Sequence, residues 1–116
     1  MKTDLSYLKS MTEGDRELIS EMIEIFSTQV EEYNGLMQDY LRQKDWQELS
    51  RLAHKAKSSV AIMGMKELAD KLRKLEVMAK EEKEVHSFPS YVEYFNIACN
   101  EAITELNEYL SKEYPY

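Results

Sequence analysis

The sequence is short of the residues that interrupt helices or cross-link chains. Its 116 residues include three glycines, two prolines and one cysteine. β-Sandwiches and barrels need a turn signal about every 8–12 residues, so the scarcity of glycine and proline argues against them. A single cysteine excludes an intrachain disulfide framework and every multi-cysteine zinc site. The composition therefore predicts an all-helical fold.

Long apolar runs and an excess of basic charge are also missing. No run approaches the roughly 18–20 residues of a membrane span, and the first residues have no signal-peptide core. The formal net charge is −7, whereas nucleic-acid binding needs a basic surface. The two histidines, His54 and His86, do not have metal-ligand spacing. We therefore expect a small cytoplasmic protein that binds neither membranes nor nucleic acid and holds no metal of its own.

Apolar residues recur at intervals of three and four through most of the chain, which indicates helices. The pattern predicts a short amphipathic helix over residues 3–11 and four longer helices, over about 15–41, 46–63, 65–82 and 90–112. Asp45 with Glu48 is typical of a capping box, and Gly64 is a natural helix stop. Long helices with short connections favour antiparallel neighbours. We expect residues 1–116 to form one domain, an up-down antiparallel four-helix bundle with a short N-terminal capping helix.

One histidine lies away from the apolar face of its helix. The core face of the helix over 46–63 comprises Leu49, Leu52, Ala53, Ala56, Val60 and Met63, and His54 lies about 140° from its centre. Its neighbours include the small residues Ser50 and Ser58 one turn away and Ala61 two turns away, with Lys57 three residues on. Packing does not require an imidazole there, so His54 should be exposed and open to a bulky partner. Exposure alone would also fit an ordinary surface histidine.

The residues around His54 follow a known pattern. Alanine and histidine are followed by a lysine, a small polar residue and, about ten residues after the histidine, a glycine; here these are Ala53, His54, Lys57, Ser59 and Gly64. In these residues the chain resembles histidine-containing phosphotransfer (HPt) domains of multistep phosphorelays. The resemblance spans nearly the whole chain, because similar residues fall at Phe26, at Asp45-Trp46 and at Leu75-Glu76.

The resemblance implies that His54 accepts a phosphoryl group from an aspartyl-phosphate of a receiver domain and passes it to another receiver. Lys57 would stabilise the phosphoryl charge. Ser58 stands where the family usually has glycine, and its hydroxyl could hydrogen-bond a phosphoryl oxygen. The family picture places Mg²⁺ on the receiver, so we expect neither metal nor cofactor in this chain, and no second acid or base around His54. A glycine-rich ATP loop is missing, so the chain is a phosphoryl carrier and not a kinase by itself.

The expected partners are response-regulator receiver domains and a hybrid sensor histidine kinase, bound by a monomer. The residues that we expect to dock a receiver are Ser50, Arg51, Ala61, Ile62, Gly64 and Met65. Between positions 51 and 74 there are seven basic and two acidic residues, and this local excess suits an acidic partner.

A second apolar stripe, formed by Leu18, Met22 and Ile25, flanks the main face of the long helix. We favour the interpretation that Leu5, Leu8 and Met11 cover it. The alternative is that part of the stripe joins Ile62 and Met65 in the docking surface.

An alternative function is a phosphate-independent helical adaptor that binds receiver or kinase domains. Such a protein would keep the fold but lose a residue needed for the chemistry. Because His54 and Lys57 are both present, the sequence favours phosphotransfer.

Overall fold

Every regular element of the computed structural model, which describes residue 4 and residues 6–113, is helical. The elements follow in the order α1 (Ser6–Thr12), α2 (Arg16–Gln43), α3 (Trp46–Ile62), α4 (Lys66–Glu81), a 3₁₀ turn η1 (Val85–Ser87) and α5 (Phe88–Glu113). The prediction of an all-helical fold is confirmed. None of these described helices is both long and apolar enough to cross a membrane.

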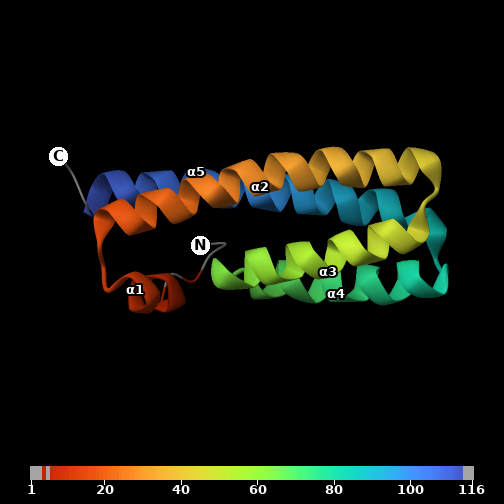
Figure 1. Cartoon of the computed structure of the whole chain (residues 1–116), viewed down its shortest axis with the longest axis horizontal. Helices are drawn as coiled ribbons and strands as arrows, with labels where there is room; N and C mark the ends of the chain where they lie inside the picture. The colour runs from red at the N-terminus through yellow and green to blue at the C-terminus, as the bar shows by residue number, and fades with distance from the viewer. Residues whose placement is uncertain (1–3, 5, 114–116) are drawn as a thin grey trace.

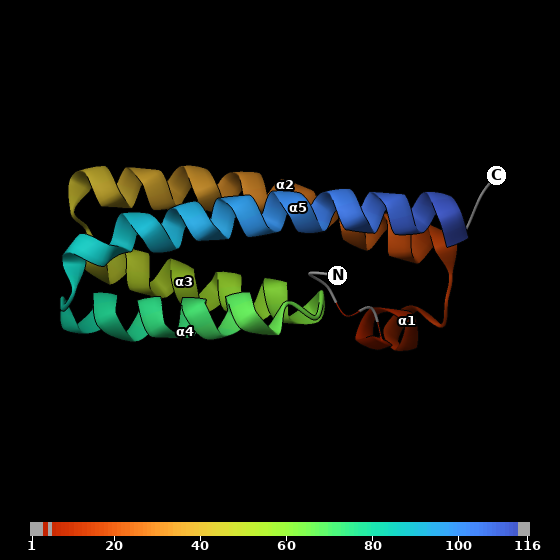
Figure 2. The same cartoon turned by 180° about the vertical axis from the view of Figure 1, so that it is seen from behind.

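The four long helices lie side by side along the 48 Å axis of the molecule, α2 beside α5 and α3 beside α4 (Figures 1 and 2). α2 has 28 residues and α5 has 26, whereas α3 has 17 and α4 has 16. At 1.5 Å per residue, the α2–α5 pair is therefore longer by roughly 15 Å. α1 lies beside this overhang, next to the end of the α3–α4 pair (Figure 1), and contributes the fully buried Leu8.

Polar side chains cap the first turns of α2 and α3. The Asp15 carboxylate accepts hydrogen bonds from the backbone N–H groups of Glu17 and Leu18 at the start of α2. Asp45 does the same for the N–H of Glu48 at the start of α3. These bonds satisfy donors that the first turn of a helix cannot pair internally. The predicted cap at Asp45 therefore forms, and it sets where α3, which carries the histidine, begins.

The turn between α3 and α4 depends on Gly64. Its backbone has φ +72°, in the left-handed region that favours glycine. A Cβ atom there would lie 2.2 Å from the backbone oxygen of Asp4 and 2.5 Å from its nitrogen. The N–H of Asp4 in turn donates to the carbonyl of Met63, at 3.3 Å. Gly64 therefore both ends α3 and leaves room for the backbone of Asp4.

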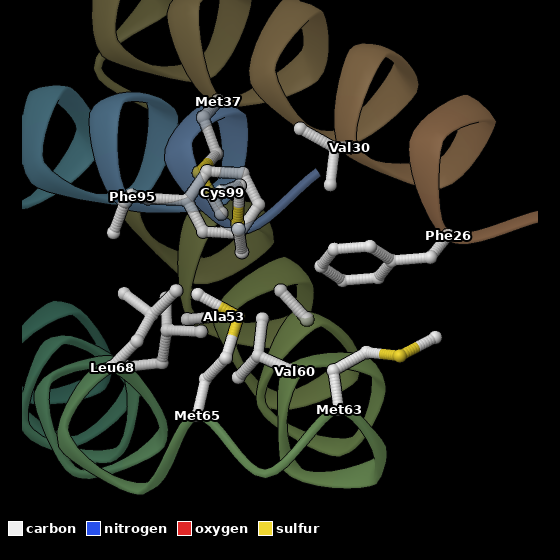
Figure 3. Packing of buried hydrophobic residues seen from close by; sticks show 14 of the residues in the cluster. Phe26, Val30, Met37, Ala53, Val60, Met63, Met65, Leu68, Phe95 and Cys99 are labelled. Atoms are coloured by element: carbon white, nitrogen blue, oxygen red, sulfur yellow. The ribbon is translucent and has the colours of Figure 1, made fainter. Parts of the chain in front are cut away.

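The hydrophobic core fills the space between the α2–α5 pair and the α3–α4 pair (Figure 3). The predicted core face of α3 is confirmed, because each of its six members is at most 5% exposed. Ala53, directly before His54, packs in this core, so the histidine is carried on a helix whose opposite face is fixed. Cys99 is also buried, and burial raises the pKa of its thiol to about 12.

The favoured interpretation of the second apolar stripe is wrong for two of its residues. Leu18 is 46% and Ile25 is 58% exposed. α1 is short and lies beside the overhang, where it buries Leu8 but leaves Met11 exposed. Leu5 lies outside the described residues. An apolar surface on α2 therefore remains open to solvent.

Gly35 lies on the solvent side of α2, and a Cβ atom added there would meet nothing within 4 Å. We expect Gly35→Ala to raise the free energy of unfolding by about 1 kcal/mol, because alanine loses less backbone entropy in a helix interior. Gly64→Ala should lower the free energy of unfolding, since alanine there is strained at positive φ and clashes with the backbone of Asp4. Urea unfolding of both variants checks this, and a neutral Gly64→Ala would contradict the assigned role of that turn.

Candidate functional site

His54 projects from the middle of α3 into solvent. Its side chain is 62% exposed, while the residues directly before it, Leu52 and Ala53, are buried. Ser58 and Ala61, which follow it by one and two turns, are exposed and small. The predicted exposure of His54 is confirmed, and its ring stands where a second protein can reach it.

One carboxylate holds both the histidine and the nearby lysine. Nδ1 of His54 lies 3.0 Å from Oε2 of Glu76, and Nζ of Lys57 lies 3.3 Å from Oε1 of the same carboxylate. Lys57 and Glu76 are 29% and 25% exposed, so this contact is partly shielded from water. The three side chains, from α3 and α4, form what we call the histidine network.

The histidine network determines which ring nitrogen is free. An ionised carboxylate has no proton to give and can only accept a hydrogen bond. Nδ1 of His54 is therefore the donor in its contact with Glu76, and in the neutral ring the lone pair lies on Nε2. A hydrogen bond at one ring nitrogen commonly fixes the role of the other in this way. Nε2 is thus the ring nitrogen whose lone pair is not engaged by Glu76.

The expectation that no second acid or base surrounds His54 is wrong, because Glu76 contacts its ring. In the sequence the Leu75-Glu76 pair only contributed to the family resemblance. The sequence nevertheless contained a signal for the contact between Glu76 and His54. α3 and α4 form a hairpin about Gly64, so residues ten positions before it and twelve after it are brought together. Antiparallel pairing across the turn would have placed Glu76 near His54.

The α3–α4 hairpin is held in this register by polar contacts. The hydroxyl of Ser50 donates to the carbonyl oxygen of Glu76 at 2.8 Å. One turn earlier, the amide of Gln47 donates to the carbonyl of Lys80 at 3.1 Å. At the same end of the hairpin, the ring of Trp46 at the start of α3 meets Phe88 of α5 edge-on, with centroids 5.2 Å apart. The hydrogen bonds of Ser50 and Gln47 fix the position of α4, and with it the Glu76 carboxylate, against α3.

The pKa of Glu76 reflects the electrostatics of the histidine network. Partial burial alone would raise the pKa of its carboxyl group. The hydrogen bonds from His54 and Lys57 and their positive charge outweigh this effect, so the pKa of Glu76 is lowered from its ordinary value of 4.5. Glu76 is thus held in its ionised, accepting form.

The predicted docking residues do not all reach the surface. Arg51 is exposed and pairs with Glu48, and Ala61 and Ile62 are also exposed. Ser50 is only 6% exposed, because its hydroxyl is used between α3 and α4, and Met65 is 3% exposed in the core. The side chains of Ser50 and Met65 therefore cannot form a docking surface, and their prediction is corrected.

Two hollows flank the exposed face of α3. One, of about 560 Å³, is lined by Gln47, Ser50, Arg51, His54, Lys55, Glu76 and Lys80, and we call it the histidine hollow. The other, of about 160 Å³, lies between α2 and α3 and is lined by Met22, Ile25, Phe26, Gln29, Ser59, Ile62 and Met63; we call it the apolar groove. The first is polar and contains the histidine, and the second continues the exposed apolar surface of α2.

No three His, Cys, Asp or Glu side chains within residue 4 and residues 6–113 lie where they could share a metal ion. The site offers an exposed imidazole beside one carboxylate and several cations.

Comparison with known families agrees with this geometry. A model of the Hpt domain matches residues 21–111, which cover α3 and α4 entirely and most of α2 and α5. The chain belongs to the Hpt family. Hpt domains carry out histidine phosphotransfer in phosphorelays and interact with response-regulator receiver domains. Neither the search of curated proteins nor that of solved structures returned a significant match.

The ionised Glu76 makes the stability of this Hpt domain depend on pH. Because its pKa is lowered on folding, its contribution is present above the unfolded value near 4.5 and is lost as the pH falls through the lower folded value. We expect the difference in unfolding free energy between the wild type and Glu76→Gln to shrink between about pH 5 and pH 3. Urea unfolding across this range measures it, and a difference independent of pH would contradict the assignment.

Proposed function

We propose that this Hpt domain accepts a phosphoryl group on Nε2 of His54 from a receiver aspartyl-phosphate and passes it to another receiver. The observation that carries the proposal is the contact between Nδ1 of His54 and the Glu76 carboxylate, which leaves Nε2 free on an exposed ring. On this proposal the four long helices serve as an up-down antiparallel bundle that holds the network rigid.

The transfer step forms one bond to phosphorus and breaks another. The Nε2 lone pair attacks phosphorus, the N–P bond forms and the P–O bond to the receiver aspartate breaks. The aspartate leaves as a carboxylate with the bonding electron pair. The hydrogen on Nδ1 stays in its contact with Glu76. Phosphoryl transfer passes through a loose transition state, so catalysis is mainly positioning and charge stabilisation.

Lys57 and Ser58 support the transfer. In the resting protein the ammonium of Lys57 is held by Glu76 on the same side of α3 as the ring. A phosphoryl group on Nε2 would offer this ammonium a second anionic partner, and the exposed hydroxyl of Ser58 lies one turn beyond the histidine. We propose that the receiver brings Mg²⁺, which would neutralise charge on the phosphoryl oxygens.

The receiver docks, on our proposal, over the exposed face of α3 and the apolar groove. Ile62 lies eight residues beyond His54 on the helix, roughly 12 Å away. A standard protein interface covers about 800 Å² on each partner, enough to span both. Arg51 and Lys55 at the rim supply positive charge to an acidic receiver pocket. A phosphate-independent adaptor would need the same surface but not the histidine network.

The histidine is tested by His54→Gln. The variant should fold, because the side chain is exposed, and should take up no label from a phosphorylated receiver. The wild type should carry a phosphate that is stable to base and labile to acid. His86→Gln is the matched control, since His86 is also exposed and lies beside a carboxylate, 3.5 Å from Glu84. Labelling of His54→Gln at the wild-type level would refute the proposal, and receiver binding without any label in the wild type would favour the adaptor.

The docking surface is tested by Ile62→Glu and Ile25→Glu. Each places a carboxylate in the apolar groove, so we expect receiver affinity to fall about tenfold or more. Ile97→Glu is the control, because Ile97 is 49% exposed on α5 and does not line the groove. Titration calorimetry with a receiver compares the three variants. Equal losses in all three, or no loss in either groove variant, would argue for docking elsewhere.

A further inference from the structure

The histidine hollow has an uneven distribution of charge. Its described lining residues come only from α3 and α4. Arg51, Lys55 and Lys80 contribute positive charge, and Glu76 contributes the single negative charge. Arg51 already pairs with Glu48 on α3. Glu76 is therefore the one carboxylate of the hollow that faces the ring, and it touches Nδ1, the nitrogen that does not receive the phosphoryl group.

Whether Nδ1 carries a proton determines how easily a phosphohistidine gives up its phosphoryl group. Attack by the neutral ring produces a phosphoimidazolium, with phosphorus on Nε2 and the hydrogen still on Nδ1. From this form the ring departs as neutral imidazole when the N–P bond breaks. If Nδ1 first loses its proton, the ring must depart as an imidazolate anion, which is a much poorer leaving group. The protonated form is thus the reactive donor.

We propose that Glu76 retains the proton on Nδ1 after phosphorylation, so that this domain holds its phosphoryl group as a labile donor and not as a stable store. The inference rests on the proposed phosphotransfer through His54. It assigns Glu76 a positioning role in the donor step, beyond fixing the nucleophilic nitrogen in the resting protein.

Because of Lys57, the Glu76 carboxylate acts more strongly on the Nδ1 proton after His54 is phosphorylated than before. In the resting network the Lys57 ammonium neutralises part of the Glu76 charge, across 3.3 Å. Once phosphorus is on Nε2, the phosphoryl oxygens compete for this ammonium with about two negative charges. The carboxylate then acts more fully on the ring proton. Lys55, Lys80 and Arg51 oppose the proton by like charge, so without Glu76 the charged residues that line the hollow are all cations.

Glu76→Gln separates the carboxylate charge from the hydrogen bond. The amide oxygen of glutamine still accepts from Nδ1, so the ring keeps its orientation, but the negative charge is gone. The variant is labelled from a phosphorylated receiver, the receiver is removed, and the loss of phosphate from His54 is followed from about pH 5 to pH 9 by ³¹P NMR. The measured quantity is a first-order rate on protein already labelled, so a slower loading step does not enter it.

We expect the wild type to lose phosphate roughly two- to fivefold faster than Glu76→Gln at about pH 8, which corresponds to an exposed ion pair of up to 1 kcal/mol. The two rates should converge toward pH 5, because the high proton concentration there makes retention of the proton by Glu76 unnecessary. Glu84→Gln is the matched control, because it removes the same charge beside the other histidine and should follow the wild-type profile.

Coincident profiles for the wild type and Glu76→Gln would overturn the inference and leave the proposed function standing. So would a change in rate by the same factor at every pH, since that would indicate only a displaced ring. Absence of any label on the wild type would instead refute the proposed function itself.

Discussion

The structure of the site depends on Glu76, which joins α4 to α3 through both its backbone and its side chain. Its carbonyl oxygen accepts the hydroxyl hydrogen of Ser50, and its carboxylate accepts hydrogen bonds from His54 and Lys57. The backbone bond fixes the register of the α3–α4 hairpin, and this register brings the carboxylate to the ring. A shift of α4 by one residue would rotate Glu76 by about 100° and remove it from the histidine.

The buried and exposed faces of α3 have different roles. Its buried face, which includes Ala53 next to the histidine, anchors the helix in the core between the two helix pairs (Figure 3). Its exposed face carries the imidazole among small side chains, so a partner domain meets little obstruction. Since the two faces share no side chain, substitutions on the exposed face can leave the core intact. The buried Ser50 is the exception, because it lies near the exposed face but holds α4 in place.

The two flanks of the histidine differ in chemistry. Toward α4 lies the polar histidine hollow, with one carboxylate and several cations. Toward α2 lies the apolar groove, continuous with the exposed Ile25. On the proposed function, the first flank would control the protonation and charge of the ring, and the second would offer apolar area for association. A phosphoryl carrier of this kind would need both, because it would hold the group only briefly and would have to recognise the protein that delivers or removes it.

The helices, the cap at Asp45, the core face of α3 and the exposure of His54 could all be predicted from the sequence, because they follow from local spacing along one helix. It also pointed to the family through the residues from Ala53 to Gly64. The contact of Glu76 with Nδ1, the burial of Ser50 and Met65 and the exposure of Ile25 become evident only in the folded chain. These facts depend on how one helix is placed and rotated against another, which the periodicity of a single helix does not specify.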